Sequence, residues 1–297
     1  MKTLLPQLLC LTAVLAMLGA YQKGNVNNTF NPPITAITSG LQDNSLVSLD
    51  INGDGRYIVF STSVALLAND QDNLYDIYRY DRVNNTTQLI STNLVSNSFG
   101  VSVDNSGNKI LYTASQSLSQ PSSPTAIYLW DNGNITTLQE GQADPLIPNF
   151  FSPLVAFTNI ISPDGNLVGA HVNLNHIIID LTTSQSEVLG QGQPIDFSSN
   201  SRYHTWSNVD IANPSAAPNI FVYDRQSGSN TPITNTTKYS GQPMISGDGQ
   251  FTVFESELGN LTGAEDNNGL NDVFVFDASK PSYRRLSPAD ANGPSTF

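Results

Sequence analysis

Short runs of apolar and aromatic residues recur along the chain after residue 45. Residues 56–60 (RYIVF), 76–81 (DIYRYD), 250–254 (QFTVF) and 272–277 (DVFVFD) are rich in β-branched and aromatic side chains and alternate in part with polar ones. This is the pattern of short, half-buried β-strands. Asp, Asn, Ser and Gly gather between the runs, where a chain turns. Because no window after residue 20 has a long helical period with caps, the pattern predicts an all-β protein.

The runs belong to one repeating unit, in which a turn and a strand are followed by a connection and a second strand that ends in aspartate. Five such units fit between Leu46 and Leu286, and their strand-ending aspartates are Asp81, Asp131, Asp180, Asp224 and Asp277. A period in the forties to low fifties suits four short strands with their turns, which is one blade of a β-propeller. Stacking such units around an axis buries their apolar faces and protects their edges. An open β-solenoid is the alternative, but its repeats are usually shorter.

A tight turn precedes the second strand of every unit. Its central residues are Asp54-Gly55, Ser106-Gly107, Asp164-Gly165, Asn200-Ser201 and Asp248-Gly249. Glycine supplies the positive φ that such a turn requires, and Asp or Asn caps it. Residues 50–55 (DINGDG) also match the start of an EF-hand loop, but Ser61 stands where that loop needs a bidentate Glu. We therefore interpret this segment as a hairpin turn.

The repeat resembles the WD40-like repeats of TolB-type propellers. The strongest matches are residues 52–60 with 76–82, residues 161–165 (ISPDG), and residues 245–254 with 272–277. The resemblance covers residues 34–297 and implies a propeller there. It implies little about function, because propellers serve many unrelated activities. TolB itself has an α/β domain before its propeller, whereas only a short segment precedes the first strand here, so a TolB role is not carried over.

The number of blades is five or six. Residues 34–38 (ITAIT) precede the five units and resemble the rim strand at residues 86–91. If Ser287 is aligned with Ser91, Phe297 falls opposite Val101, inside an inner strand. We therefore favour six blades with the last one incomplete, so that roughly 30–40 residues would be missing after Phe297. A five-bladed ring with ragged ends remains the alternative.

The first twenty residues have the layout of a secretory signal peptide. Lys2 provides the positive start, residues 4–18 the apolar stretch, and Gly19 and Ala20 the small residues for cleavage. We expect a signal peptide at 1–20, a linker at 21–33, a propeller at 34–297, and a periplasmic or extracellular location. No second stretch of that kind follows, so we expect no membrane span. The single cysteine, Cys10, lies in this segment, so the mature chain would have no disulfide.

Charge narrows the range of partners. The formal net charge is −13, with 12 Lys plus Arg among 297 residues. Such a surface repels phosphate backbones and anionic membranes, so nucleic-acid binding is not expected. A protein or peptide ligand at one face of the propeller fits better, and basic proteins, divalent cations and neutral sugars are all compatible with this charge.

Two connections have carboxylates at short spacing. Both lie before the third strand of a unit, and their residues are Asp70, Asp72 and Asp76 in the first unit and Asp266, Asn268 and Asp272 in the fifth. Hard oxygen ligands at such spacing on a loop suit Ca²⁺, which is the one cofactor that the sequence suggests. The alternative is that these residues form Asx turns and strand ends that shape the hairpin.

Other candidate chemistry is sparse. His171 and His176 flank a short turn and can face each other across a hairpin, but two ligands without a third of fixed geometry do not define a zinc site. Packed or solvated histidines are expected, His204 included. Gly-x-Ser-x-Gly, His-Glu-x-x-His and Walker motifs are absent. Residues 146–157 (LIPNFFSPLVAF) interrupt the repeat as either a hydrophobic lip or core packing.

Three functions follow from this combination. The first is an exported, non-enzymatic propeller that binds a protein, peptide or envelope ligand. The second is a propeller enzyme, a glycoside or lactone hydrolase or lyase, that uses carboxylates or a metal in the central channel. The third is the N-terminal propeller of a longer, prolyl-oligopeptidase-like serine peptidase. The lack of a catalytic motif favours the first.

Overall fold

The computed structural model describes residues 46–92, 96–115, 125–141, 159–172, 175–208, 217–258, 261–262 and 270–287. Every regular element in these residues is a β-strand, which confirms the all-β prediction. The predicted signal peptide, the linker, the extra rim strand at 34–38 and the apolar segment at 146–157 lie outside the described residues. Among the described residues, no helix is long and apolar enough to span a membrane.

The strands form antiparallel sheets in which chain neighbours pair in order. Blade 1 consists of β1 (Leu46–Ile51), β2 (Tyr57–Thr62), β3 (Asp76–Asp81) and β4 (Thr86–Leu89). Blade 2 consists of β5 (Asn97–Val103), β6 (Lys109–Ser115), β7 (Thr125–Asp131) and β8 (Asn134–Gly141). Blade 5 consists of β16 (Ser240–Ile245), β17 (Phe251–Ser256), β18 (Asp272–Asp277) and β19 (Ser282–Arg285).

Blades 3 and 4 share one strand and so form a single seven-stranded sheet. Its members are β9 (Ile160–Ile161), β10 (Leu167–Val172), β11 (Asn175–Asp180), β12 (Gln185–Phe197), β13 (Tyr203–Asn208), β14 (Ile220–Asp224) and β15 (Ser229–Pro232). Residues 185–191 of β12 pair with β11 as the rim of blade 3, and residues 192–197 pair with β13 as the inner strand of blade 4. Gly190 and Gly192 have φ of 150° and 157°, which lets the strand pass from rim to centre.

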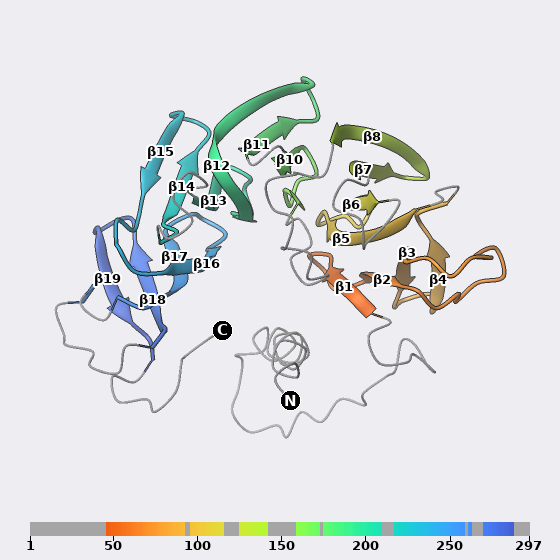
Figure 1. Ribbon diagram of the computed structural model, residues 1–297, viewed down its shortest axis with the longest axis horizontal. Helices are drawn as coiled ribbons and strands as arrows, with labels where there is room; N and C mark the ends of the chain where they lie inside the picture. Colours follow the sequence, from red (N-terminus) through yellow and green to blue (C-terminus); the bar gives the residue numbers. More distant parts are fainter. Residues whose placement is uncertain are drawn as a thin grey trace.

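The five blades follow one another around an arc whose inner strands face a common centre (Figure 1). This arrangement confirms the predicted multi-blade β-propeller and its five four-strand units, although β12 serves two of them. In the described part of the chain, the arc is open between blade 1 and blade 5 (Figure 1).

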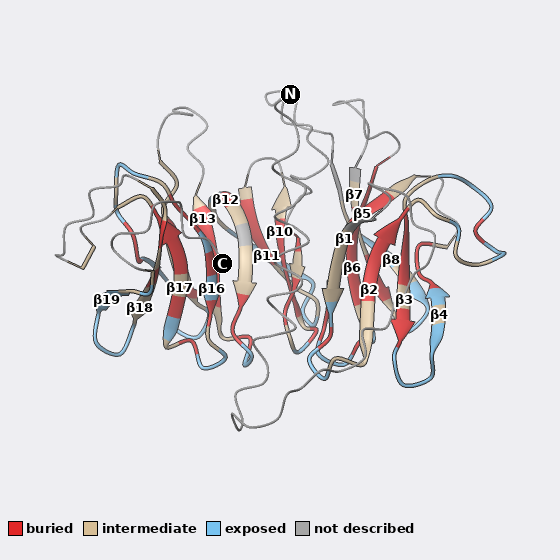
Figure 2. Ribbon diagram, turned by 90° about the horizontal axis from the view of Figure 1, so that it is seen from below, coloured by how far each residue is buried: buried red, intermediate tan, exposed pale blue. Residues whose placement is uncertain are grey.

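Apolar clusters fill the spaces between successive blades. Between blades 1 and 2, for example, Val59 and Ile77 pack against Ile110 and Tyr112, all of them fully buried. Comparable clusters join blade 2 to 3, blade 3 to 4 and blade 4 to 5. Because successive side chains of a strand point to opposite faces, each central blade contributes to two of these clusters. Burial follows the middles of the strands, and exposure increases toward the turns (Figure 2).

The predicted tight turn is present in all five blades. Its fourth residue has a positive φ each time: Gly55 71°, Gly107 73°, Gly165 70°, Ser201 55° and Gly249 79°. Its first residue accepts a hydrogen bond from the backbone N–H five residues later, as Ser246 Oγ does from Phe251 at 2.9 Å. The sequence pattern thus identifies a structural hairpin turn, in agreement with the prediction for residues 50–55.

The same turn also contacts the preceding blade. A Cβ built on Gly249 would lie 2.0 Å from Tyr203 Cδ2 of blade 4, and one built on Gly107 would lie 2.1 Å from Tyr57 Cδ2 of blade 1. The guanidinium group of Arg202 lies over the Tyr203 ring, 4.7 Å from its centroid. Glycine is therefore required here for close approach as well as for its φ.

The two edges of the ring carry different connections. The turns between the first and second strands and between the third and fourth strands lie at one edge, which we call the lower edge. The connections from second to third strands, such as residues 63–75 in blade 1, lie at the opposite or upper edge (Figure 2).

Candidate functional site

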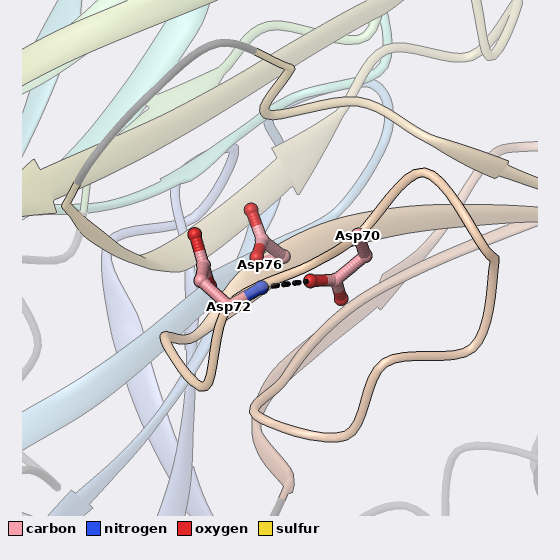
Figure 3. A group of neighbouring side chains, drawn as sticks. All are labelled: Asp70, Asp72 and Asp76. Atoms are coloured by element: carbon pink, nitrogen blue, oxygen red, sulfur yellow. Dashed lines mark hydrogen bonds between the residues drawn. The ribbon is translucent and has the colours of Figure 1, made fainter.

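The predicted calcium ligands of blade 1 lie together at the upper edge. Asp70 and Asp72 come from the connection between β2 and β3, and Asp76 begins β3. One carboxylate oxygen from each lies within 4.8 Å of the others, and the three side chains lie next to one another (Figure 3). Asp70 and Asp76 are buried, whereas Asp72 is exposed. This arrangement offers a cation several oxygen ligands and access to solvent.

Local hydrogen bonds hold the three carboxylates in place. Asp72 accepts from the Leu74 N–H at 2.8 Å, which is the Asx turn expected from the sequence. The Tyr78 hydroxyl donates to Asp70, and the Ser91 hydroxyl donates to Asp76. Turn formation and cation binding are thus compatible uses of the same residues.

The negative charge of this cluster is uncompensated by the described residues, none of which forms an ion pair with it. Burial raises the pKa of Asp76 to about 6, and the charges of Asp70 and Asp72 add to the shift while the Ser91 hydrogen bond opposes it. A buried carboxylate held among like charges is costly, and a bound cation would remove that cost.

In blade 5 the corresponding aspartate forms an ion pair with an arginine. Asp272 corresponds to Asp76, and Ser287 donates to it at 2.6 Å as Ser91 does in blade 1. In blade 5, however, Arg285 Nη1 lies 3.0 Å from Asp272 Oδ2, and both side chains are almost fully buried. The residue at the place of Arg285 in blade 1 is Leu89, by strand register. The other two predicted ligands of blade 5, Asp266 and Asn268, lie outside the described residues.

The strand-ending aspartates cap the turns that follow them. Asp81 accepts from the N–H groups of Val83 and Asn84 and pairs with Arg56 at 2.7 Å. Asp224 is held in the same way by Arg202, at 2.7 Å. The hydrogen bonds from these arginines hold the pKa of each aspartate well below its usual range. These carboxylates are therefore structural.

Two aspartates at the centre of the ring were not singled out from the sequence. Asp50 Oδ2 accepts from the Val103 N–H of blade 2, and Asp196 Oδ2 from the Ile245 N–H of blade 5, both at 2.8 Å. Both residues lie two positions before the tight turn on an inner strand. Ser102 occupies that position in blade 2 and accepts from the blade 3 backbone at 3.2 Å. These side chains therefore link inner strands of successive blades.

Burial raises the pKa of both central aspartates to about 6, against the lowering effect of their backbone hydrogen bonds. The charge of Asp50 also raises the pKa of Asp196, so the two carboxylates interact electrostatically across the arc. The sequence signal for these residues is an Asp two positions before the tight turn. Blades 3 and 5 have Ile160 and Met244 at that position, so the pattern does not recur in every repeat.

Two of the three histidines, His176 and His204, are packed in the interior, and His171 is half-buried. His171 and His176 are opposite each other in the β10–β11 pair, which confirms the predicted hairpin contact. His176 also contacts His204 of the next blade, with their Nε2 atoms 2.8 Å apart, and both residues are fully buried. Sequence reasoning missed this contact because the two residues belong to different repeats.

Comparisons with known proteins identify the fold. No protein-family model and no curated protein sequence matches the chain. TolB from Acinetobacter baumannii is 17% identical with a TM-score of 0.45, over 72% of this chain and 49% of that one, so the chain spans about half the length of that neighbour. Oligogalacturonate lyase from Vibrio parahaemolyticus is 12% identical with a TM-score of 0.56, over 86% of this chain and 68% of the lyase.

A third neighbour is the β-propeller domain of the Trilobed protease from Pyrococcus furiosus, which is described as having an open velcro topology. It is 12% identical with a TM-score of 0.52, over 82% of this chain and 71% of that one. At such identities the likeness concerns the fold alone. The chain has a β-propeller fold, and the fold that the resemblance of its repeats implies is confirmed at that level.

Proposed function

We propose that the chain is an exported, non-enzymatic propeller that binds a protein, peptide or envelope ligand at one face of its ring. The observation that supports this proposal is the use made of its carboxylates. Asp81 and Asp224 cap turns, and Asp50 and Asp196 link blades. These four acidic residues maintain the scaffold, and a rigid scaffold is suited to presenting loops to a partner.

The upper edge is the better candidate for the binding face. It carries the long connection of residues 63–75 in blade 1, whereas the described turns of the lower edge are tight and only a few residues long. Binding residues concentrate on longer loops that a rigid framework positions. The net charge of −13 favours a basic partner.

An exported location rests on the composition of residues 1–20. Its test is the mass and N-terminal sequence of the protein recovered from the periplasm or medium. A mature N-terminus near residue 21 supports export, and an intact Met1 on cytoplasmic protein contradicts it.

Cross-linking with matched variants tests the binding function. Ala68 is exposed on the upper-edge connection of blade 1, and Val83 is exposed on a lower-edge turn of the same blade. We expect a cross-linked product in an extract of the producing cells that Ala68→Arg weakens and Val83→Arg does not. A product that neither variant changes contradicts the choice of the upper edge.

An enzymatic role is the alternative, and structural neighbours named as oligogalacturonate lyase and acylaminoacyl peptidase are its motivation. It predicts turnover of a sugar, lactone or peptide substrate by the purified chain. Turnover that disappears in a full-length variant such as Asp196→Asn or Asp76→Asn would overturn the non-enzymatic proposal. If the chain is the front of a longer peptidase, activity would depend on residues after Phe297.

We further propose that Asp70, Asp72 and Asp76 bind Ca²⁺ in blade 1. The comparison with blade 5 supports this, because Arg285 neutralises the corresponding aspartate there and Leu89 leaves Asp76 without such a partner. For blade 5 itself, Asp272 is already paired, so the predicted set Asp266, Asn268 and Asp272 remains the weaker proposal.

Terbium luminescence tests calcium binding, because Tb³⁺ replaces Ca²⁺ and is excited through a nearby tyrosine. Tyr78 contacts Asp70 and is well placed to act as that donor. We expect Tb³⁺ luminescence that added Ca²⁺ abolishes by competition. Asp72→Asn should lower the affinity for Tb³⁺ at least tenfold. Asp54→Asn, at an exposed turn aspartate of the same blade, is the control. Equal luminescence in both variants contradicts the site.

A further inference from the structure

The interface between blades 3 and 4 contains a pair of buried histidines. His176 on β11 and His204 on β13 have their Nε2 atoms 2.8 Å apart, and both side chains are fully buried. The centroids of the two rings are 4.7 Å apart. Trp206 lies beside His176, and Phe197 lies beside His204. The histidine pair therefore connects two blades inside an aromatic environment.

The contact between the two Nε2 atoms determines which protonation state fits this geometry. An Nε2-to-Nε2 hydrogen bond needs one ring to donate its proton and the other to accept it. The accepting ring, when neutral, carries its own proton on Nδ1. Neither Nδ1 atom makes a hydrogen bond of good geometry among the described residues, although the Asp196 backbone carbonyl lies close enough to His204 to favour a proton there. The neutral pair thus leaves one buried N–H without a well-placed acceptor, which is already a cost.

Each added proton makes the arrangement worse. The first would go to the free Nδ1 of the donating ring and would place a positive charge and a second unpaired N–H in the apolar interface. The second would have to occupy the Nε2 atom that accepts the hydrogen bond, so the bond would break and two cations would face each other. The interface is therefore compatible with the neutral pair only.

The surrounding groups do little to offset this cost. His171, on β10, disfavours a charge on His176, and the backbone carbonyl of Asp196, on β12, favours a charge on His204. The Asp196 carboxylate itself is bound to the Ile245 N–H. Farther along the same interface, Tyr223 donates to Glu187 and Arg225 pairs with Asp180. Burial outweighs these contributions and lowers the pKa of both rings, to about 2 for His176 and about 3 for His204.

We propose that the histidine pair is a pH-sensitive contact that holds blades 3 and 4 together when both rings are neutral and lets the interface open when the solution is acidified. In the opened form each ring is solvated and takes up a proton near pH 6.5. At pH 5 this favours opening by about 30-fold for each histidine and by up to roughly 1,000-fold for the two together, relative to pH 7.5 and above.

The location makes the proposal specific. All three histidines of the chain lie in blades 3 and 4, so no other described interface contains a group of this kind. The aspartates with raised pKa act in the opposite direction, because they bind protons more readily in the folded state between about pH 4 and 6. Opening at pH 5 should therefore be confined to β10–β13.

Hydrogen–deuterium exchange of the full chain at pH 7.5 and pH 5, corrected for the intrinsic exchange rate, tests the proposal. We expect peptides from β10–β13 to gain far more exchange at pH 5 than peptides from β2–β3 or β17–β18. The double variant His176→Leu/His204→Leu should lose this difference, and His171→Leu should keep it. A double variant with undiminished acid-induced exchange overturns the proposal.

A second measurement needs no variant. The imidazole resonances of the native chain report the protonation of each histidine between pH 7.5 and 4.5. The proposal expects His176 and His204 to remain neutral wherever β10–β13 stay protected from exchange. If either ring titrates near pH 6.5 while those strands remain protected, the interface tolerates the charge and the proposal is wrong.

Discussion

Replacing Gly249 by alanine tests how tightly the tight turns hold neighbouring blades together. Gly249 has a φ of 79°, and its Cβ position lies 2.0 Å from Cδ2 of Tyr203 in blade 4. Gly228 has a φ of 70°, and nothing lies within 4 Å of its Cβ position. The two glycines thus share the conformational requirement and differ in the inter-blade contact, which makes Gly228→Ala a matched control.

The expected magnitudes follow from these two contributions. A left-handed conformation costs a non-glycine residue about 1–2 kcal/mol, and both variants lose this amount. Forcing a methyl group against a packed ring costs a further 1–3 kcal/mol or so, and only Gly249→Ala loses that. The free energy of unfolding should therefore fall by about 1–2 kcal/mol in Gly228→Ala and by about 2–5 kcal/mol in Gly249→Ala.

Urea unfolding followed by tryptophan fluorescence measures both values, provided that the slope m is unchanged. The double variant Tyr203→Ala/Gly249→Ala should recover the steric part, because the ring that the methyl group meets is gone. Equal losses in Gly249→Ala and Gly228→Ala would refute the reasoning, since they would mean that the turn does not bear on the preceding blade.

Three further predictions concern charge and backbone conformation. Arg285→Leu should lower the free energy of unfolding by about 3–5 kcal/mol, because Asp272 stays buried and loses its ion pair. Adding Asp272→Asn should restore most of this stability, and a small loss in the single variant would contradict the importance of the ion pair. Asp196→Asn should raise the free energy of unfolding by about 1–3 kcal/mol at pH 7.5, where the raised pKa of about 6 makes the charged form costly. Most of this gain should be lost near pH 4, where the carboxyl is neutral in the folded state and about half neutral in the unfolded state. Urea titrations at both pH values check this, and equal gains would contradict it. Ser201→Gly should gain roughly 0.5 kcal/mol, because Ser201 holds a φ of 55° where the other blades have glycine; thermal unfolding measures the gain.

The repeat made the fold predictable, because its signals are local. A hairpin turn needs a positive φ and a capping side chain within a few residues, and Asp164-Gly165 shows both in the sequence alone. Strand type follows from neighbouring side chains in the same way. The same locality explains the clustering of Asp70, Asp72 and Asp76, which are brought together by one connection.

Features that join different repeats could not be predicted. The partners of Asp50 and Asp196 are backbone groups of the next blade, and backbone groups leave no trace in the sequence. His176 and His204 meet only because two blades pack together. The continuous strand β12 was hidden for another reason: Gly190, Gly192 and Pro194 are residues typical of a break, yet here the glycines let a strand change blades.

The sharing of β12 gives the ring an uneven mechanical structure. If the chain were pulled from its ends, blades 1, 2 and 5 could each detach as a separate hairpin stack, because their described sheets share no strand with another blade. Blades 3 and 4 have no such connection between them, since the ladder of β11 and the ladder of β13 lie on the same strand. Force that strips one of these blades loads the other directly. The largest single step in extension should therefore come from the middle of the chain, where two blades yield as one.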